Sequence, residues 1–220
     1  MYDWGDRTLR DFPFFTTQYG VASIVLKEVP YRGEAYIKIQ SALDPAALLD
    51  ECVGFCRAVG AARVYAAGHA FLAEYPIHTS VLQMRCSREA LDDTDAALFP
   101  VQEATLQNWR ELYNIKMADV DNASYMTEND GRRMLEAGNG YFIHRNGKLI
   151  GIGVAAGDKI DAVISCAPGN GRDVVLALNH ALSGDSVQLE VASTNKRAIK
   201  LYEKLGFLTV NEVSRWHKIY

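Results

Sequence analysis

The stretch LEVASTNKRAIKLYEKLGF, residues 189–207, reads as the end of a strand, a tight turn and a helix with both ends marked. Asn195 stands just before the helical run, where its side chain can accept a hydrogen bond from an amide of the first turn. The apolar side of the helix is formed by Ala198, Leu201, Tyr202 and Leu205. Gly206 suits the left-handed residue that ends a helix, and Phe207 can pack back over the last turn. Local structure alone accounts for every one of these residues.

Upstream of this stretch, the hydrophobic period changes repeatedly between that of a strand and that of a helix. We predict strands at residues 98–104, 140–146, 148–157, 161–167 and 186–193, helices at 105–118, 127–138, 169–184 and 194–206, and a last strand or hairpin at 207–220. The Asn146-Gly147 pair is typical of a tight hairpin turn, and the short connections around it favour antiparallel pairing. The second half therefore predicts a fold of the α/β (α+β) class, with a mixed, mainly antiparallel sheet flanked by helices.

The first part of the chain gives a shorter series of elements. We predict a hairpin of residues 20–29 and 34–40, a helix from Asp44 and Pro45 to Gly60, and strands at 62–68 and 79–86. The polar, acidic residues 87–97 are the best linker candidate, which predicts two domains, 1–96 and 97–220. This ββαββ order is similar to a shortened version of the second half. We interpret it as a degenerate half-repeat with a structural or substrate-shaping role.

Composition and charge exclude several classes of protein. The 220 residues are 49% hydrophobic and 23% charged, with a net charge of -4 and no basic block, so we expect no nucleic-acid partner. Residues 1–12 carry acids and no apolar core of a signal peptide, and no window resembles a membrane span. We expect a cytoplasmic protein that does not bind membranes. The four cysteines and five histidines lack ligand spacings, which predicts buried reduced thiols and no structural metal.

One turn has the composition of an anion site. Residues 168–171, Pro-Gly-Asn-Gly, join a predicted strand to a helix whose first residues are Gly171, Arg172 and Asp173. Glycines allow close backbone approach, and the free amides of a helix start favour a phosphate. An ordinary strand-to-helix turn explains the same residues, and Asp173 already complements the helix dipole.

The C-terminal stretch carries a family resemblance. NKRAIKLYEKLGF, preceded by VQLEVAS, closely resembles the signature of the GNAT superfamily of acetyltransferases, in which Asn, Ala, Tyr, Gly and Phe occur at these spacings. The order of elements over residues 97–220 is similar to that of the family as well. The resemblance implies an N-acetyltransferase that moves an acetyl group from acetyl-CoA to a primary amine by direct transfer. It places the cofactor in a V-shaped opening between strands 161–167 and 186–193.

The resemblance also implies roles for individual residues. Pantetheine amides would pair with the backbone of Val163, Ile164, Ser165, Cys166 and Ala167, and the pyrophosphate with the amides of Gly169, Asn170, Gly171, Arg172 and Asp173. Asn195 would contact the pantetheine arm, and the Tyr202 hydroxyl would protonate the leaving thiolate. The family's phosphate loop usually begins with Arg or Gln and has Gly or Ala four to five residues later, where this chain has Pro168 and Asp173. These departures favour an alternative, a catalytically degenerate GNAT-like module that binds acyl-CoA or acts as a sensor.

The general base and the acceptor are less well specified. An ammonium must lose a proton before it attacks, so we expect a carboxylate or His near the thioester, with Glu190 preferred to His144. Glu190 is equally explained as a surface carboxylate. The resemblance to the family implies that the loop between the first two helices binds the substrate. In this chain that loop carries Asp119, Asp121 and Tyr125, which could contact a cation.

The expected acceptor is a small-molecule or peptide amine, with polyamines, amino acids, antibiotics and peptide N-termini all open, and a homodimer is an assembly that the sequence allows. A third interpretation takes residues 163–171 as the glycine loop of a Rossmann-type methyltransferase, with Glu190 on the ribose. Only about fifty residues follow that loop, too few for the remaining units of a doubly wound sheet.

Overall fold

The computed structural model describes residues 14–220, and these form two compact units. The C-terminal unit is Leu82–Glu212, and the N-terminal unit is residues 14–81 together with Val213–Tyr220. Two long strands, β5 (Ile77–Ser87) and β11 (Leu208–Lys218), contribute residues to both units. Residues 1–12, on which the expectation of no signal peptide rests, lie outside the described part of the chain.

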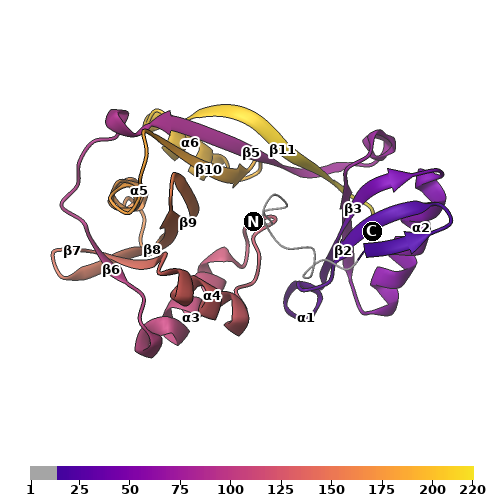
Figure 1. Ribbon diagram of the computed structural model, residues 1–220, viewed down its shortest axis with the longest axis horizontal. Coiled ribbons are helices and arrows are strands. Elements are labelled where there is room, and N and C mark those ends of the chain that lie inside the picture. The colour runs from indigo at the N-terminus through magenta and orange to yellow at the C-terminus, as the bar shows by residue number, and fades with distance from the viewer. Residues whose placement is uncertain (1–13) are drawn as a thin grey trace. The chain divides into compact units, whose positions relative to one another are not determined.

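The C-terminal unit is built on a curled, mainly antiparallel sheet (Figure 1). Its strands follow the order β5-β10-β9-β8-β7-β6, where the further bounds are β6 (Ala97–Pro100), β7 (Gly140–Arg145), β8 (Lys148–Ala156), β9 (Lys159–Ser165) and β10 (Ser186–Ala192). Strands β6 to β9 pair antiparallel, whereas β9 and β10 are parallel. The predicted fold class is confirmed. The antiparallel pairs are incompatible with the doubly wound parallel sheet of a Rossmann-type methyltransferase.

Helices cover both faces of this sheet. They are α3 (Leu106–Met117), α4 (Glu128–Ala137), α5 (Gly171–Asn179) and α6 (Lys196–Lys204), with the 3₁₀ turns η2 (Arg88–Ala90) and η3 (Glu103–Thr105). Because successive strand residues face opposite sides, β9 directs Val163 toward the core with α5 and α6, and Ile164 toward the core with α3 and α4. The strand thus carries helices on both sides.

The ends of α6 follow the sequence pattern closely. The Asn195 Oδ1 accepts a hydrogen bond from the Ala198 amide at 3.1 Å, as expected of a cap. Gly206 has a φ of 87°, and the Phe207 amide donates to the Tyr202 carbonyl at 3.0 Å. Phe207 is fully buried, so the last turn is closed by packing as well as by hydrogen bonds. The predicted helix is confirmed.

Two predicted boundaries need correction. The strand predicted at 98–104 ends at Pro100, since the backbone turns into η3 soon afterwards. The helix predicted at 169–184 ends at Asn179 and is followed by turns. The last segment, predicted as a strand or a hairpin, is the single strand β11.

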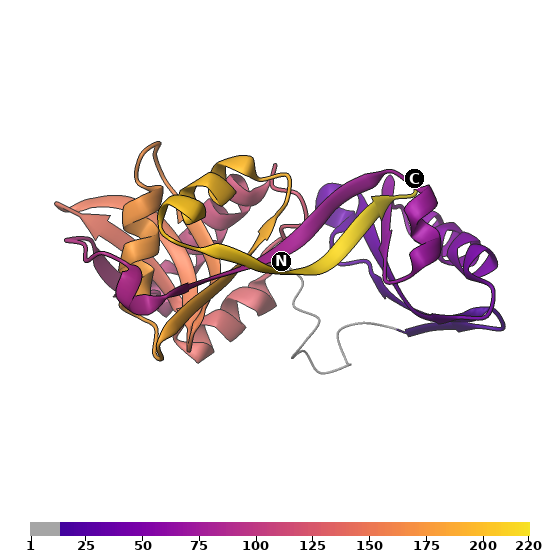
Figure 2. The ribbon, with the colours of Figure 1, turned by 90° about the horizontal axis from the view of Figure 1, so that it is seen from above.

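The N-terminal unit is a smaller sheet covered by one helix (Figure 2). Its elements are β1 (Phe14–Thr17), β2 (Gly20–Val25), α1 (Val29–Arg32), β3 (Glu34–Ala42), α2 (Pro45–Ala58), β4 (Arg63–Ala67) and the 3₁₀ helix η1 (Ala70–Glu74). The predicted hairpin is confirmed as β2 and β3, with the short α1 in the connection. Asp44 caps α2 by accepting from the Ala47 amide at 3.1 Å, as its position predicts. The end of β11 completes this sheet, where His217 lies opposite Ala66 of β4.

The two units share an order of elements. Each has three antiparallel strands, a helix and a strand parallel to the third one: β1-β2-β3-α2-β4 in the first and β7-β8-β9-α5-β10 in the second. This order favours the hypothesis of a degenerate half-repeat. The units differ at the parallel pair, since β3 and β4 stay in register from Glu34↔Arg63 to Lys38↔Ala67. The N-terminal unit therefore has no opening between these strands.

Two expectations about composition can be compared with residues 14–220. None of the helices there has the length and apolar character that crossing a membrane requires. Cys52, Cys56 and Cys86 are buried thiols, as predicted. Cys166 differs, because it follows β9 at the edge of a cleft and is only partly buried.

Candidate functional site

The sheet of the C-terminal unit opens between β9 and β10. These strands pair only at Gln188↔Lys159 and Leu189↔Ile160 and then separate. On its other edge β9 stays paired with β8 as far as Ser165↔Gly151. The edge of β9 that faces β10 therefore keeps backbone amides and carbonyls without a strand partner, which is where an extended ligand can add hydrogen bonds.

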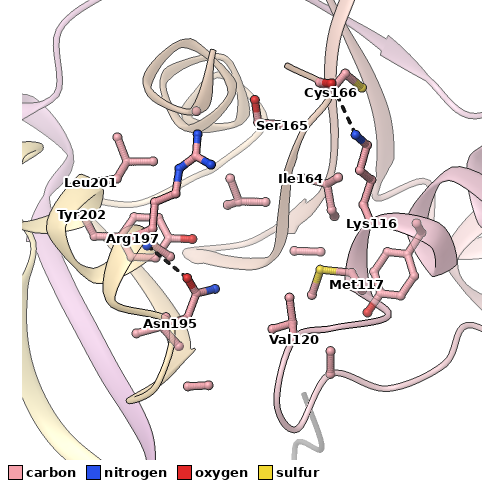
Figure 3. A pocket seen from close by; sticks show the side chains of 18 of the residues that line it. Lys116, Met117, Val120, Ile164, Ser165, Cys166, Asn195, Arg197, Leu201 and Tyr202 are labelled. Carbon is pink, nitrogen blue, oxygen red and sulfur yellow. Dashed lines mark hydrogen bonds between the residues drawn. The ribbon is translucent and has the colours of Figure 1, made fainter. Parts of the chain in front are cut away.

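A cleft of about 640 Å³ occupies this opening (Figure 3). Its walls are β9 with the loop that follows, β10, the start of α6, and α3 with the loop before α4. The structure brings most of the predicted residues together here: Val163, Ile164, Ser165, Cys166, Ala167, Gly169, Gly171, Arg172, Glu190, Asn195, Tyr202 and Asp121. Four others do not line the cleft: Asn170, Asp173, Asp119 and Tyr125. Sequence motifs located the walls, but not every side chain.

The turn from β9 to α5 forms the anion-attracting end of the cleft. Gly169 has a φ of 92°, a conformation that side chains disfavour. A side chain at Gly171 would lie 2.9 Å from the Leu201 side chain, so glycine lets the start of α5 approach α6. The first amides of α5 have no partners within the helix, and its dipole favours a negative group beside them.

The carboxylate of Asp173 is held away from this end. Its Oδ2 lies 2.5 Å from Nη1 of Arg145, the last residue of β7, and both side chains are partly buried. An anion at the start of α5 would therefore meet a neutralised pair. The Arg145 guanidinium, 28 positions earlier in the chain, thus offsets the negative charge of Asp173 beside the start of α5.

Cations that the motifs did not single out approach the same end. In Figure 3 the Arg197 side chain extends from α6 toward Ser165, and Lys116 of α3 reaches the opposite wall, where its Nζ donates to the Cys166 carbonyl at 3.4 Å. Arg172 also lines the cleft, and its guanidinium contacts the Asp92 carboxylate. A sequence signal for Arg197 existed. Lys196 and Arg197 begin a helix that has no acid in its first turn. Their positive charges oppose the helix dipole unless an anion binds there.

Tyr202 supplies a phenol to the cleft. Its side chain comes from the middle of α6, is 7% exposed, and packs against Phe207 with ring centroids 5.8 Å apart. Burial raises the pKa of Tyr202 well above its ordinary value. The hydroxyl thus stays protonated and can act as a proton donor.

Of the two candidate bases, only Glu190 lies in the cleft. It follows Leu189, where β10 leaves β9, and its Oε1 lies 3.4 Å from Nζ of Lys159. His144 does not line the cleft. Its ring instead meets Phe99 edge-on, with centroids 5.1 Å apart.

Cys166 is a potential nucleophile at the edge of the cleft. Burial raises the pKa of its thiol, and the nearby Lys116 lowers it by less. The thiol therefore stays protonated, which disfavours an acyl-cysteine intermediate.

The loop between α3 and α4 separates the three predicted substrate-binding residues. Asp121 lies at the cleft, where its Oδ2 accepts from the Thr194 hydroxyl at 2.6 Å and ties the loop to the start of α6. Tyr125 lines a different groove, between α3 and α4, together with Arg110 and Glu128. Asp119 is exposed and lines neither hollow.

Sequence comparison gives no relative for this chain, since neither the family models nor the curated proteins contain a match. Solved structures do match. A putative acetyltransferase from Pyrococcus horikoshii is similar at 12% identity and a TM-score of 0.58, over 92% of this chain and 70% of that one. A GCN5-related N-acetyltransferase from Kribbella flavida is similar at 12% identity and 0.55, over 91% and 56%. A functionally unknown conserved protein from Staphylococcus epidermidis matches at 11% and 0.59, over 96% of both chains.

These likenesses define the fold. The chain has an α/β sheet that opens between two parallel strands, with helices on both faces. That is a GNAT-like fold, as the motif in residues 195–207 predicts. At identities of 11–12%, the fold alone follows from the comparison.

Proposed function

We propose that this protein is an N-acetyltransferase that moves an acetyl group from acetyl-CoA directly to a primary amine. The proposal depends on one observation above all. A single cleft brings together an unpaired strand edge, the start of α5 and a buried, protonated Tyr202. Each of these matches a different part of an acyl-CoA: the pantetheine amides, the pyrophosphate and the thioester sulfur.

The residues present fit this cofactor. The edge of β9 that faces β10 can hold the pantetheine amides, and the amides of Gly169, Gly171, Arg172 and Asp173 can hold the pyrophosphate. The Asn170 amide instead donates to the Ala167 carbonyl at 3.4 Å, which also accepts from the Ser165 hydroxyl. Lys116 and Arg197 supply positive charge at that end, whereas Arg172 is paired with Asp92. Pro168 offers no amide, which leaves the loop with one donor fewer than the family pattern. When bound, acetyl-CoA supplies an activated acyl carbon and a thiolate leaving group.

The chain's own groups then have two proton-transfer tasks. Glu190 is placed to accept a proton from the incoming ammonium, either directly or through water, so that the neutral amine forms the C–N bond. As the C–S bond breaks, the Tyr202 hydroxyl donates its proton to sulfur. The nitrogen gives up two protons on its way from ammonium to amide. The first passes through Glu190 to solvent before attack, and the second leaves after the C–N bond has formed and replaces, through solvent, the proton that Tyr202 gave to sulfur.

The alternative is a GNAT-like module that binds acyl-CoA or acts as a sensor without transfer. Pro168 favours it, since the phosphate loop lacks one amide. The bond from Lys116 to the Cys166 carbonyl favours it too, because it occupies a backbone acceptor expected to face pantetheine.

Calorimetric titration with acetyl-CoA tests cofactor binding, which both candidate functions require. We expect saturable binding, and no heat at high micromolar protein would contradict both candidates. Release of free thiol with a panel of primary amines then separates them. Thiol release with any amine supports the enzyme, and binding without release across the panel supports the module.

The pair formed by Arg145 and Asp173 gives a sharper test of the cofactor's position. Arg145→Ala should weaken acetyl-CoA binding about five- to tenfold, because it leaves an uncompensated carboxylate beside the pyrophosphate. Adding Asp173→Asn to that variant should restore most of the affinity. Equal affinities for all three proteins, measured by the same titration, would place the pyrophosphate elsewhere.

A further inference from the structure

An acidic segment of the C-terminal unit has no role in the chemistry above. Residues 87–97, whose composition favours a linker, are instead held against α5, and we call them the strap. Within the strap, Arg88 donates from Nη2 to the Asn179 carbonyl at the end of α5, at 3.2 Å. Leu91 and Ala96 pack in the hydrophobic core that contains the buried residues of α5. The strap is therefore fixed to the unit at several points.

Two consecutive acids of the strap pair with the two ends of α5. Asp92 pairs with the guanidinium of Arg172 in the first turn, and Oδ1 of Asp93 lies 3.0 Å from Nε2 of His180 after the last turn. Their partners differ in position, since Arg172 lines the cleft and His180 does not. The carboxylate of Asp92 thus neutralises a cation at the end of the cleft that attracts anions.

The position of Arg172 on α5 explains why it needs an anion. A cation in the first turn of a helix is unfavourable by itself, because the free amides there already carry partial positive charge. The Asp92 carboxylate offsets the charge of Arg172 in this structure. A phosphate group at the start of α5 would offset the same charge. The strap and an anionic ligand therefore compete for one guanidinium.

The two ion pairs that flank the start of α5 differ in burial. The side chains of Arg145 and Asp173 are 33% and 17% exposed, whereas those of Arg172 and Asp92 are 48% and 74% exposed. Pairs between exposed side chains contribute little to stability, because water solvates the separated charges well. Separating Arg172 from Asp92 therefore costs less than separating the other pair. Arg172 is the cation that an incoming ligand can take over.

We propose that the strap is an internal competitor of the cofactor: Asp92 holds Arg172 in the free protein and releases it to a phosphate group of acetyl-CoA. The inference rests on the proposed function for the identity of this ligand. Because one ion pair breaks as another forms, Arg172 adds little net affinity in the wild-type protein. The contacts of Arg88, Leu91 and Ala96 do not involve Asp92, so the strap stays on α5 when the pair opens.

The test compares wild type, Asp92→Asn, Arg172→Gln and the double variant by calorimetric titration with acetyl-CoA at low salt. Asp92→Asn should bind about three- to fivefold more tightly, because Arg172 is then unpaired before the ligand arrives. Adding Asp92→Asn to Arg172→Gln should bring no such gain. Asp93→Asn is the matched control, since it removes the neighbouring charge, whose partner His180 lies outside the cleft, and should change the Kd less than twofold.

Two further measurements separate the competition from the identity of the ligand. Inorganic pyrophosphate, titrated while the backbone amide NMR signals are followed, presents the phosphates without the rest of the cofactor, and Asp92→Asn should again bind more tightly than wild type. High salt should reduce the gain for both ligands, because it screens the charges of exposed groups. The unfolding temperature of Asp92→Asn should match that of wild type, since the other contacts of the strap remain.

Several results would overturn the proposal. An equal gain from Asp92→Asn and Asp93→Asn, or a gain that persists without Arg172, would reduce the effect to net charge. Unchanged affinity of Asp92→Asn for both ligands would remove the competition, and a clearly lower unfolding temperature would make the pair a structural anchor. If pyrophosphate binds with the expected pattern but acetyl-CoA does not bind, the proposed function fails and the competition stands. Binding of neither ligand contradicts both.

Discussion

Replacing Tyr202 by Phe should slow acetyl transfer about 10²- to 10³-fold, while the affinity for acetyl-CoA changes less than twofold. Phe fills nearly the same volume, so the packing of Tyr202 against Phe207 should survive. The hydroxyl is the only group lost. Single-turnover rates with a saturating amine, together with the titration described above, separate the two quantities.

The dependence of the transfer rate on pH follows from the direction in which burial shifts the pKa of Tyr202. Burial raises the pKa of Tyr202, so the acid form persists through and beyond the neutral range. Tyr202 should therefore cause no loss of rate on the alkaline side below a pH of about 10. Loss of rate on acidification has to come from protonation of the base or of the amine. The rates of Tyr202→Phe should consequently fall at every pH by a similar factor.

Tyr65→Phe is the matched control. Tyr65 is also a buried tyrosine, 3% exposed, but it belongs to β4 of the N-terminal unit and is absent from the cleft wall. It should leave the transfer rate unaltered. An unchanged rate in Tyr202→Phe would assign the proton donor to another group, and a similar loss in Tyr65→Phe would indicate a general effect of losing a buried hydroxyl.

Much of the C-terminal unit could be predicted because its signals are local. The cap at Asn195, the stop at Gly206 and the period of the strands each depend on residues a few positions apart. The same holds for Asp44 in the N-terminal unit. Backbone hydrogen bonding and side-chain spacing act over one or two turns, and a single sequence records them directly.

The features that escaped prediction join distant parts of the chain. Arg145 at the end of β7 pairs with Asp173 in the first turn of α5, and Lys116 of α3 contacts the Cys166 carbonyl 50 positions later in the chain. No local pattern reports such pairs.

The role of β5 is the largest of these long-range features. Its strand position was predicted at 79–86, but the predicted boundary at residue 97 assigned it to the first domain. In the structure it neighbours β10, and its Gln83 donates to the Gln188 side chain at 3.0 Å. Met84 and Cys86 are buried in the same core as Val187 and Leu189. The sheet of the C-terminal unit therefore depends on a strand from before the boundary.

We accordingly expect two truncated proteins to behave differently. Residues 77–212 keep β5 and all of the C-terminal unit, and should give a soluble protein that unfolds cooperatively and binds acetyl-CoA. Residues 97–212 lack β5, which exposes one edge of β10 and empties the space of Met84. Losing a buried Met side chain alone costs about 2–5 kcal/mol, a large part of the 5–15 kcal/mol that usually stabilises a domain. This shorter protein should be unfolded or aggregated.

Thermal unfolding followed by circular dichroism, together with titration with acetyl-CoA, distinguishes the outcomes. Met84→Ala in the 77–212 protein should have a stability between those of the two truncated proteins. That variant should fold with a lowered melting temperature, because it leaves a cavity but keeps the hydrogen bonds of β5. If residues 97–212 fold and bind acetyl-CoA as tightly as residues 77–212, then β5 is dispensable and a boundary at residue 97 is correct. If neither folds, the C-terminal unit depends on residues 14–76 or 213–220 as well. Whether β5 is required thus decides whether the C-terminal unit can form the proposed acetyl-CoA cleft by itself.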